Sequence, residues 1–248
     1  MMKMTKVYGH RGSRTRRPEN TMCSFRLALE EGADGLEIDI CTTADGEIVI
    51  SHDSNLKRCG GVDFAIGSHS YEELSRIPVH CPDLFGAAYQ SEAFVPKLSE
   101  LFEFLCGNQA LLNIEIKQQS DREYGYIEEK TLALAAQYGL SGRIFYSSFD
   151  EYILVKLREL DPHAKTALLF SSPHYNAGAH AQALGCFAIH PSISGAEQYE
   201  DLQKARARGM DCNVWTVNDP ATAQRLVAEG ATGIITDLPR EILQALRG

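Results

Sequence analysis

The sequence DCNVWTVNDPATAQRLVAEGATGIITDLPREILQAL, residues 211–246, alternates short apolar runs with segments of helical pattern. Residues 211–217 and 233–236 predict strands, and residues 221–229 and 240–246 predict the helices that follow them. Strands that alternate with helices are joined by right-handed crossovers and form a parallel sheet. This stretch therefore predicts an α/β fold.

The same alternation extends back to the start of the chain. The expected strands cover residues 7–10, 36–40, 110–117, 144–148, 165–170, 187–190, 211–217 and 233–236. The expected helices cover residues 21–31, 98–105, 127–138, 151–160, 177–184, 198–208, 221–229 and 240–246. Eight strand–helix units in 248 residues predict a closed (β/α)8 TIM barrel. A doubly wound open sheet is the alternative, but its first turn is normally glycine-rich, and the first turn here is His10-Arg11-Gly12.

A segment of irregular pattern interrupts the alternation after the second strand. Residues 47–51 predict a short extra strand. Residues 54–96 contain Gly60-Gly61, Pro78 and Pro82, with one expected helix near 71–77. We therefore expect a small insertion at about 54–96 within a single domain that spans residues 1–248.

The composition limits the classes of partner. A net charge of −9 and a pI near 5.4 argue against a broad nucleic-acid-binding surface. Seven scattered cysteines contain no CxxC pair, which favours reduced thiols over a disulfide framework. No apolar run is long enough to span a bilayer. We expect a cytoplasmic protein that binds no nucleic acid and does not insert stably into a membrane, and the sequence leaves homo-oligomerisation open.

Charged residues stand at the ends of two expected strands. Glu37 and Asp39 are two positions apart, and so are Glu115 and Lys117, so each pair points to one face of its strand. A buried carboxylate is costly unless it is paired or bound to a metal. Because barrels of this class carry their sites at the C-terminal ends of the strands, these charges predict a site inside the top of the barrel.

Short motifs follow one another in a fixed order: HRG at 10–12, PENT at 18–21, EID at 37–39, DG at 45–46, HD at 52–53, EIK at 115–117, VWTVN at 214–218 and GIITDLP at 233–239. As an ordered set they resemble the glycerophosphodiester phosphodiesterase family, which consists of metal-dependent hydrolases on a (β/α)8 barrel. The resemblance covers nearly the whole chain. One departure is Arg58-Cys59-Gly60-Gly61, where many relatives carry a threonine-rich sequence after the arginine.

The resemblance implies roles for individual residues. His10 and His52 take the places of the paired catalytic histidines, one acting as general acid and the other as general base. Glu37, Asp39 and Glu115 take the places of the metal ligands, and their oxygen atoms suit Mg²⁺ or Ca²⁺. Which histidine is the acid, and which of the two metals is physiological, stays open.

The resemblance also implies the substrate contacts and the reaction. Arg11 and Lys117 occupy positions near the phosphate, and Trp215 either lines the substrate mouth or fills the top of the barrel. The implied reaction is hydrolysis of a glycerophosphodiester to an alcohol and sn-glycerol 3-phosphate, with water or a substrate hydroxyl as nucleophile. Two alternatives stay open: a phosphodiesterase that cleaves lysophospholipid-type diesters through a cyclic phosphate, and a non-catalytic barrel that binds a phosphate ligand.

Several other polar and aromatic residues near these motifs receive supporting interpretations. Asp53 is expected to orient His52 or the turn, and Glu19 and Asn20 to fix their loop and cap the following helix, with Glu19 alternatively assisting a metal ligand. Asn20 or Thr21 is the expected N-cap of that helix. Asp237 is interpreted as a helix start. Phe149 and His190 are assigned to packing in the core or in a loop.

Overall fold

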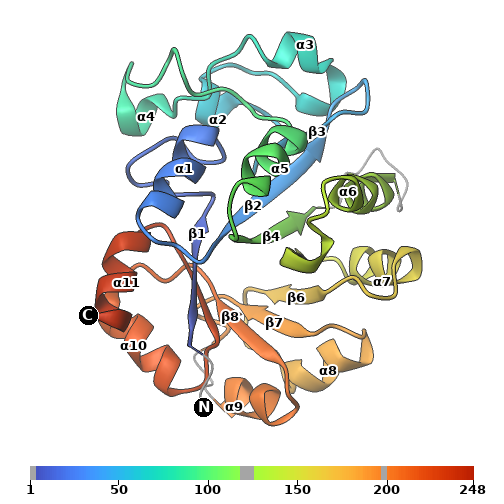
Figure 1. The fold of residues 1–248 in the computed structure, drawn as a ribbon, viewed down its shortest axis with the longest axis vertical. Coiled ribbons are helices and arrows are strands. Elements are labelled where there is room, and N and C mark those ends of the chain that lie inside the picture. Colours follow the sequence, from blue (N-terminus) through green and yellow to red (C-terminus); the bar gives the residue numbers. More distant parts are fainter. Residues whose placement is uncertain (1–3, 118–125, 197–199) are drawn as a thin grey trace.

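Eight parallel strands close into a barrel in the computed structural model, which describes residues 4–117, 126–196 and 200–248 (Figure 1). The barrel closes where β1 pairs with both β9 and β2, and β3 adds an antiparallel strand to the outer end of β2. The strands are β1 Lys6–His10, β2 Gly35–Thr42, β3 Ile48–Ile50, β4 Leu111–Ile116, β5 Ile144–Ser148, β6 Thr166–Phe170, β7 Ala188–Pro191, β8 Asp211–Val214 and β9 Gly233–Thr236. The predicted (β/α)8 barrel is confirmed.

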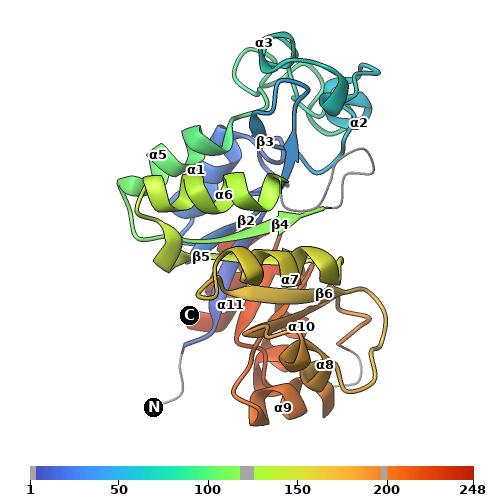
Figure 2. The ribbon, with the colours of Figure 1, turned by 90° about the vertical axis from the view of Figure 1, so that its right-hand side faces the viewer.

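Helices lie outside the strands and surround the barrel, except for α2, α3 and α4, which lie above it between β3 and α5 (Figures 1 and 2). They are α1 Met22–Glu30, α2 Lys57–Gly60, α3 Tyr71–Leu74, α4 Pro82–Phe85, α5 Leu98–Cys106, α6 Tyr126–Gln137, α7 Glu151–Leu160, α8 Ala177–Ala183, α9 Glu200–Ala207, α10 Pro220–Ala228 and α11 Pro239–Arg247. Among the helices of the described segments, none combines the length and the apolar character needed to cross a membrane.

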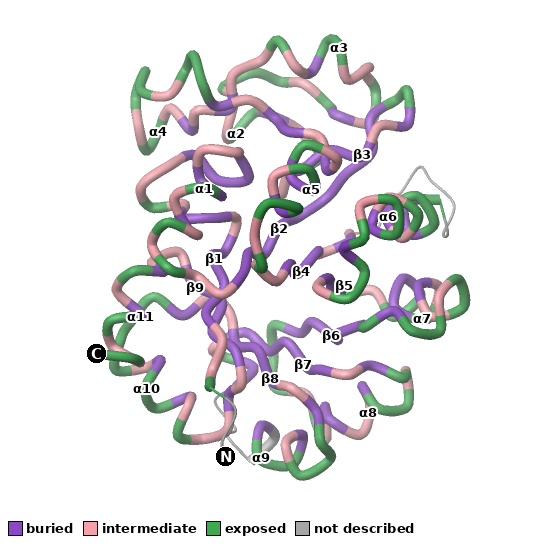
Figure 3. Tube along the Cα trace, viewed as in Figure 1, coloured by how far each residue is buried: buried purple, intermediate pink, exposed green. Residues whose placement is uncertain are grey.

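The strands bury apolar side chains against the helices and direct polar ones into the barrel. In β2, Leu36, Ile38 and Ile40 belong to the core that packs against the surrounding helices, and the residues between them are Glu37 and Asp39. Because successive strand side chains point to opposite faces, both acids point into the barrel. Every residue of β2 is buried, which Figure 3 shows as an unbroken purple segment.

Side-chain caps start several of the barrel helices. The Thr21 side chain accepts a hydrogen bond from the Ser24 amide at the start of α1, Asp150 accepts one from Tyr152 at the start of α7, and Asp219 accepts one from Thr222 at the start of α10. Such caps satisfy amides that have no partner within the helix. They fix where each chain segment leaves a strand end and enters a helix.

Residues between β3 and α5 form a small unit above the β2 end of the barrel (Figure 1). This unit has a separate hydrophobic core, in which residues of β2 and β3 pack with Leu56, Ile66, Leu74 and Val79. The sequence predicted one helix near 71–77, whereas the structure has the short helices α2, α3 and α4. A capping box between Ser70 and Glu73 starts α3, and the chain turns away before Pro78, which disfavours a helical conformation in the residue before it.

The predicted strand at 211–217 is too long. Strand β8 ends at Val214, and Trp215 forms only an isolated bridge to Ser192. The Val217 amide donates instead to the Ile235 carbonyl across the barrel wall. The apolar pattern of residues 214–217 therefore reflects burial of a strand end and the loop that follows it.

Candidate active site

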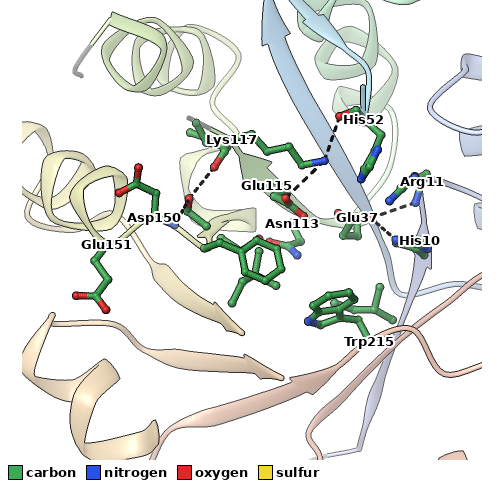
Figure 4. A pocket seen from close by; sticks show the side chains of 16 residues that line it. His10, Arg11, Glu37, His52, Asn113, Glu115, Lys117, Asp150, Glu151 and Trp215 are labelled. Atoms are coloured by element: carbon green, nitrogen blue, oxygen red, sulfur yellow. Dashed lines mark hydrogen bonds and ion pairs between the residues drawn. The ribbon is translucent and has the colours of Figure 1, made fainter. Parts of the chain in front are cut away.

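Strand register brings the predicted site residues to one level at the C-terminal end of the barrel. His10 of β1 is paired with Glu37 of β2, and Asp39 of β2 is paired with Glu115 of β4. A cavity of about 670 Å³ opens above this level. It is lined by His10, Arg11, Glu37, His52, Glu115, Lys117 and Trp215 among others, while Asp39 lies buried beside it (Figure 4).

Three carboxylates form a compact acidic cluster at this level. Glu37, Asp39 and Glu115 each offer one oxygen, and these oxygens lie within 4.8 Å of one another. Glu37 and Asp39 are buried, and Glu115 is largely so. Within the described residues, the Glu115 Oε1 atom is buried and accepts no hydrogen bond, and the Lys117 ammonium lies 3.6 Å from it. A buried carboxylate oxygen that accepts no hydrogen bond inside a group of three acids fits a bound divalent cation.

The pKa values of the three acids in this cluster are shifted in different directions. Burial and the charge of Asp39 raise the pKa of Glu37 well above its usual value and raise that of Glu115 to about 7. Burial alone would also raise the pKa of Asp39, but the positive charges of Arg11 and Lys117 hold it below its usual value. Asp39 is therefore ionised. Its negative charge opposes ionisation of Glu37 and Glu115 unless further positive charge is supplied.

His10 is held by an aspartate that follows the last strand. Its Nδ1 lies 2.7 Å from Asp237 Oδ1, and its Nε2 lies 3.9 Å from Glu37 Oε2. Because an ionised carboxylate only accepts, Nδ1 carries the proton and Nε2 faces the acids. Burial lowers the pKa of His10, and the hydrogen bond that His10 donates to Asp237 offsets this only in part.

His52 has the same kind of support. Its Nδ1 lies 2.6 Å from Asp53 Oδ1, which bears out the interpretation that Asp53 orients His52. Burial lowers the pKa of His52 as well, against the raising effect of the Asp39 charge. With Nδ1 bound to an aspartate, each imidazole has Nε2 available for proton transfer, and burial disfavours its charged form.

A chain of ion pairs continues from His52 to the first loop of the barrel. Arg58 Nε donates to Asp53 Oδ2 at 2.7 Å, and its two terminal nitrogens donate to Glu19 at 2.9 and 2.8 Å. Glu19 also accepts from Arg11 Nη1 at 2.8 Å. The insertion, which carries Arg58, thereby connects the His52 side of the site with the Arg11 loop.

Arg11 and Lys117 flank the ionised acid. Arg11 Nε lies 3.3 Å from Asp39 Oδ2, and Lys117 Nζ lies 2.7 Å from Asp39 Oδ1. Lys117 also donates to the His52 carbonyl at 3.1 Å. Both cations line the cavity, so their charges are available to an anion that enters it.

Aromatic side chains also line the cavity. Trp215 Nε1 donates to the His190 carbonyl at 2.8 Å, and the indole ring meets Phe149 edge-on with centroids 5.7 Å apart. Trp215 both lines the cavity and packs on the apolar layer that fills the barrel below. Phe149, assigned to packing from the sequence, lines the cavity and is 48% exposed, so that assignment is wrong in part.

Two interpretations of polar residues are corrected. Asp237 starts no helix, because α11 begins at Pro239 with Leu238 as its N-cap and without a side-chain cap bond. Asn20 does not cap α1; its Nδ2 donates to Asp39 at 2.9 Å, and Thr21 provides the cap. The usable signal for Asp237 was its position directly after an expected strand, where sites in these barrels lie.

Comparison with known proteins gives a consistent result. The sequence model of the Glycerophosphoryl diester phosphodiesterase family matches residues 10–241. A glycerophosphodiester phosphodiesterase of Caldanaerobacter subterraneus is 31% identical over 243 residues, covering 98% of each chain. One from Bacillus altitudinis is 31% identical over 240 residues, covering 95% of this chain and 96% of the relative. An Oleispira antarctica phosphodiesterase, solved with the product sn-glycerol-3-phosphate, superposes with a TM-score of 0.86 at 27% identity over 99% of this chain and 98% of that one.

Proposed function

This chain belongs to the glycerophosphoryl diester phosphodiesterase family, and we propose that it hydrolyses a glycerophosphodiester to an alcohol and sn-glycerol 3-phosphate in the cavity above β1, β2 and β4. The observation that carries the proposal is the convergence of two aspartate-held histidines on one acidic cluster. The Oleispira relative, whose product complex contains sn-glycerol-3-phosphate, supports the choice of product.

The acidic cluster is proposed to hold a divalent cation, Mg²⁺ or Ca²⁺. Glu37, Asp39 and Glu115 supply only oxygen donors, which both ions prefer. Burial, together with the charge of Asp39, raises the pKa of Glu37 and of Glu115, and added positive charge would favour the ionised form of both. A bound cation supplies charge that stabilises the phosphoryl oxygens during displacement.

His10 and His52 are proposed to move the protons. Each has its Nδ1 proton fixed on an aspartate, so its Nε2 is the atom that accepts or donates a proton in the cavity. One histidine accepts the proton of the attacking hydroxyl, and the other, protonated, donates to the leaving alkoxide. Asp237 and Asp53 stabilise the imidazolium that forms on either side.

Arg11, Lys117 and Trp215 are proposed to bind the substrate. A phosphodiester that enters the cavity meets the planar guanidinium of Arg11 and the ammonium of Lys117, which bind phosphate as a fork and as a point charge. Trp215 and Phe149 offer an apolar wall to the carbon atoms on the other side.

Residues 1–248 are proposed to act as one catalytic domain, to which the insertion contributes the Arg58 contacts to Asp53 and Glu19. A small-molecule phosphodiester is the proposed ligand. We place this activity in the cytoplasm, as the unpaired cysteines suggest.

The test is product analysis on the purified protein. Glycerophosphocholine and glycerophosphoethanolamine are incubated with Mg²⁺ or Ca²⁺, and release of sn-glycerol 3-phosphate is measured enzymatically. We expect release that stops with a chelator and falls about 10²- to 10⁴-fold in His10→Ala and His52→Ala. His163→Ala, at an exposed histidine far along the chain, serves as the matched control and keeps full activity. Undiminished release from both active-site variants would refute the mechanism.

The products also show whether water or a hydroxyl of the substrate is the nucleophile. Attack by water gives glycerol phosphate directly, whereas attack by a neighbouring hydroxyl of the substrate gives a cyclic phosphate first. Phosphorus NMR of an early time point distinguishes them. A cyclic product would assign the nucleophile to the substrate and leave the roles of His10 and His52 unchanged.

A further inference from the structure

Two buried polar atoms in the wall of the cavity have no hydrogen-bond partner among the residues that the structure describes. They are Oδ1 of Asn113 in β4 and Oγ of Ser147 in β5. The two residues are 1% and 0% exposed, and both line the cavity that Glu37 and Glu115 also line. A buried polar atom that stays unpaired costs free energy. Both atoms are therefore suited to a ligand that enters the cavity.

Strand register places these two side chains next to the acidic cluster. Asn113 is paired with Glu37 of β2, and Ser147 is paired with Glu115 of β4. Because residues two apart on a strand share a face, Asn113 lies one inward position deeper in the barrel than Glu115 (Figure 4). Asn113 and Ser147 are therefore diagonal neighbours on the inner surface of β4 and β5.

The neighbouring serine shows what a structural hydroxyl does at this point of the chain. Ser148 Oγ donates to the Ile116 carbonyl at 2.7 Å and accepts from the Asp150 amide at 3.0 Å. These two bonds join β5 to the end of β4 and fix the chain where α7 begins. Ser147 Oγ makes no such bond within the described part of the chain, so strand pairing and helix capping do not explain it.

Asn113 and Ser147 each offer both a donor and an acceptor. The amide has two N–H donors and a carbonyl acceptor, and the hydroxyl donates and accepts. A ligand hydroxyl also does both, so a single hydroxyl can donate to one of these side chains and accept from the other. An ammonium group only donates, and a trimethylammonium group has no N–H to donate. A hydroxylated ligand therefore fits this part of the cavity better than a choline or ethanolamine group does.

The charges in the cavity place an anion elsewhere. Arg11 and Lys117, the cations proposed to bind the phosphate, lie against Asp39 at 3.3 and 2.7 Å. Asn113 and Ser147 are paired in register with two acids instead, so a phosphate beside them would face carboxylates. The part of the ligand that reaches Asn113 and Ser147 is therefore neutral.

Apolar side chains line the same cavity. Leu169 of β6 and Ile235 of β9 are buried and present only carbon atoms to it. A short polyol can pack its carbon atoms against such side chains while a hydroxyl group binds the amide and the serine. Glycerol, with three carbons, has this combination of groups.

We propose that Asn113 and Ser147 together bind the terminal hydroxyl of the glycerol half of the substrate, an inference that rests on the proposed function. The terminal hydroxyl is the end of that half farthest from the phosphate, so it reaches deepest into the barrel. The alcohol half then extends toward Phe149, which lines the cavity and is half-exposed. A diester without this hydroxyl leaves both side chains unpaired and is a poorer substrate.

Two substrates that differ in one hydroxyl test the inference. Glycerophosphocholine has the terminal hydroxyl and 2-hydroxypropyl phosphocholine lacks it, while both keep the hydroxyl that could act as an internal nucleophile. With choline release as the assay, the parent protein should prefer glycerophosphocholine at least tenfold in kcat/KM. Asn113→Ala and Ser147→Ala should each lose roughly tenfold in kcat/KM on glycerophosphocholine and almost nothing on 2-hydroxypropyl phosphocholine.

The kinetic outcomes separate the inference from the proposed function. An equal loss on both substrates in either variant overturns the inference, because it would assign that residue to the metal or to the nucleophile. An unchanged preference in both variants overturns it as well. If the parent protein hydrolyses neither diester, the proposed function is refuted. Calorimetry then still tests Asn113 and Ser147: the parent should bind sn-glycerol 3-phosphate more tightly than 2-hydroxypropyl phosphate, and equal affinities would overturn the inference.

Thermal unfolding without ligand distinguishes a binding group from a structural one. Ser147→Ala should keep or raise Tm, because the hydroxyl that it removes has no partner within the described residues. Ser148→Ala is the matched control: it should lower Tm, because it removes two hydrogen bonds, and keep the preference between the two diesters. A fall in Tm for Ser147→Ala as large as that for Ser148→Ala would overturn the inference.

Discussion

His10 and Asp237 meet across the seam of the barrel, with Nδ1 and Oδ1 2.7 Å apart. The register between β1 and β9 pairs Gly9 with Thr236. It therefore places His10 beside Asp237, the residue that follows β9. Asp237 also accepts from Asn218 Nδ2 at 2.7 Å, which fixes the carboxylate. One end of the chain thus orients a proposed catalytic group at the other.

Asp237→Asn should reduce catalysis without weakening binding. The amide cannot stabilise an imidazolium and permits the wrong tautomer of His10, so we expect kcat to fall by roughly 10²-fold or more with KM nearly unchanged. Steady-state kinetics on glycerophosphocholine measure this. Asp219→Asn is the control, because it retains a good N-cap on α10 away from the site. An equal loss in both variants would mean that Asp237 has no special role.

Arg58→Lys should slow the reaction although position 58 lies outside the barrel. Lysine cannot bind Glu19 with two parallel bonds and reach Asp53 together, so His52 is left less constrained. We expect a kcat lower by about tenfold, an altered pH–rate profile and a preserved fold by circular dichroism. Arg76→Lys, at an exposed pair with Glu72 in the same insertion, is the matched control. Identical pH profiles for the two variants would contradict the prediction.

The metal-free protein should lose stability as the pH rises toward neutrality. The pKa of Glu115 is about 7 in the folded protein, above its ordinary value of 4.5, so the folded state binds more protons than the unfolded state between those values. Stability then falls with pH across this window. Thermal unfolding between pH 5 and 8 with a chelator should show a falling Tm.

Two further measurements test whether Glu115 causes this fall of Tm with pH. Adding Mg²⁺ should raise Tm most at the upper end of the window, where Glu115 is ionised. Glu115→Gln should flatten the pH dependence and remove most of the Mg²⁺ effect, whereas Glu129→Gln, on the outer helix α6, should change neither. A Tm of Glu115→Gln that responds to Mg²⁺ as strongly as the parent would exclude Glu115 as a ligand.

Trp215 should act on substrate binding. Trp215→Ala removes the ring that contacts Phe149 and lines the cavity, and we expect KM to rise roughly three- to tenfold with a smaller effect on kcat. Trp215→Phe keeps the apolar wall but loses the bond to the His190 carbonyl, so its KM should lie in between. A pure loss of kcat in both would argue for a role in the proton transfer steps.

The barrel could be predicted from the sequence because its strands and helices have distinct periods. The acids of β2 and β4 were found for the same reason, since residues at spacing two on an apolar strand share the inner face. The end of β8 was misjudged because Val217 is buried, and Trp215 is half-buried, although neither residue belongs to a strand. Burial and strand pairing leave the same apolar pattern in a sequence.

The supporting contacts of the histidines depend on the tertiary structure. The role of Asp53 could be predicted from the sequence because Asp53 directly follows His52. Asp237 and Arg58 act over long sequence separations, and only closure of the barrel and folding of the insertion bring them to the site. Asn20 and Thr21 were equally good cap candidates, and the carboxylate of Asp39 determines that Asn20 points inward.

The pairing of β1 with β9 has a consequence for biosynthesis. Translation produces the acids at 37, 39 and 115 more than a hundred residues before Asp237, the partner of His10. A nascent polypeptide can therefore contain all three carboxylates well before His10 acquires its aspartate. Proton transfer through His10 should begin only after residue 237 has been synthesised.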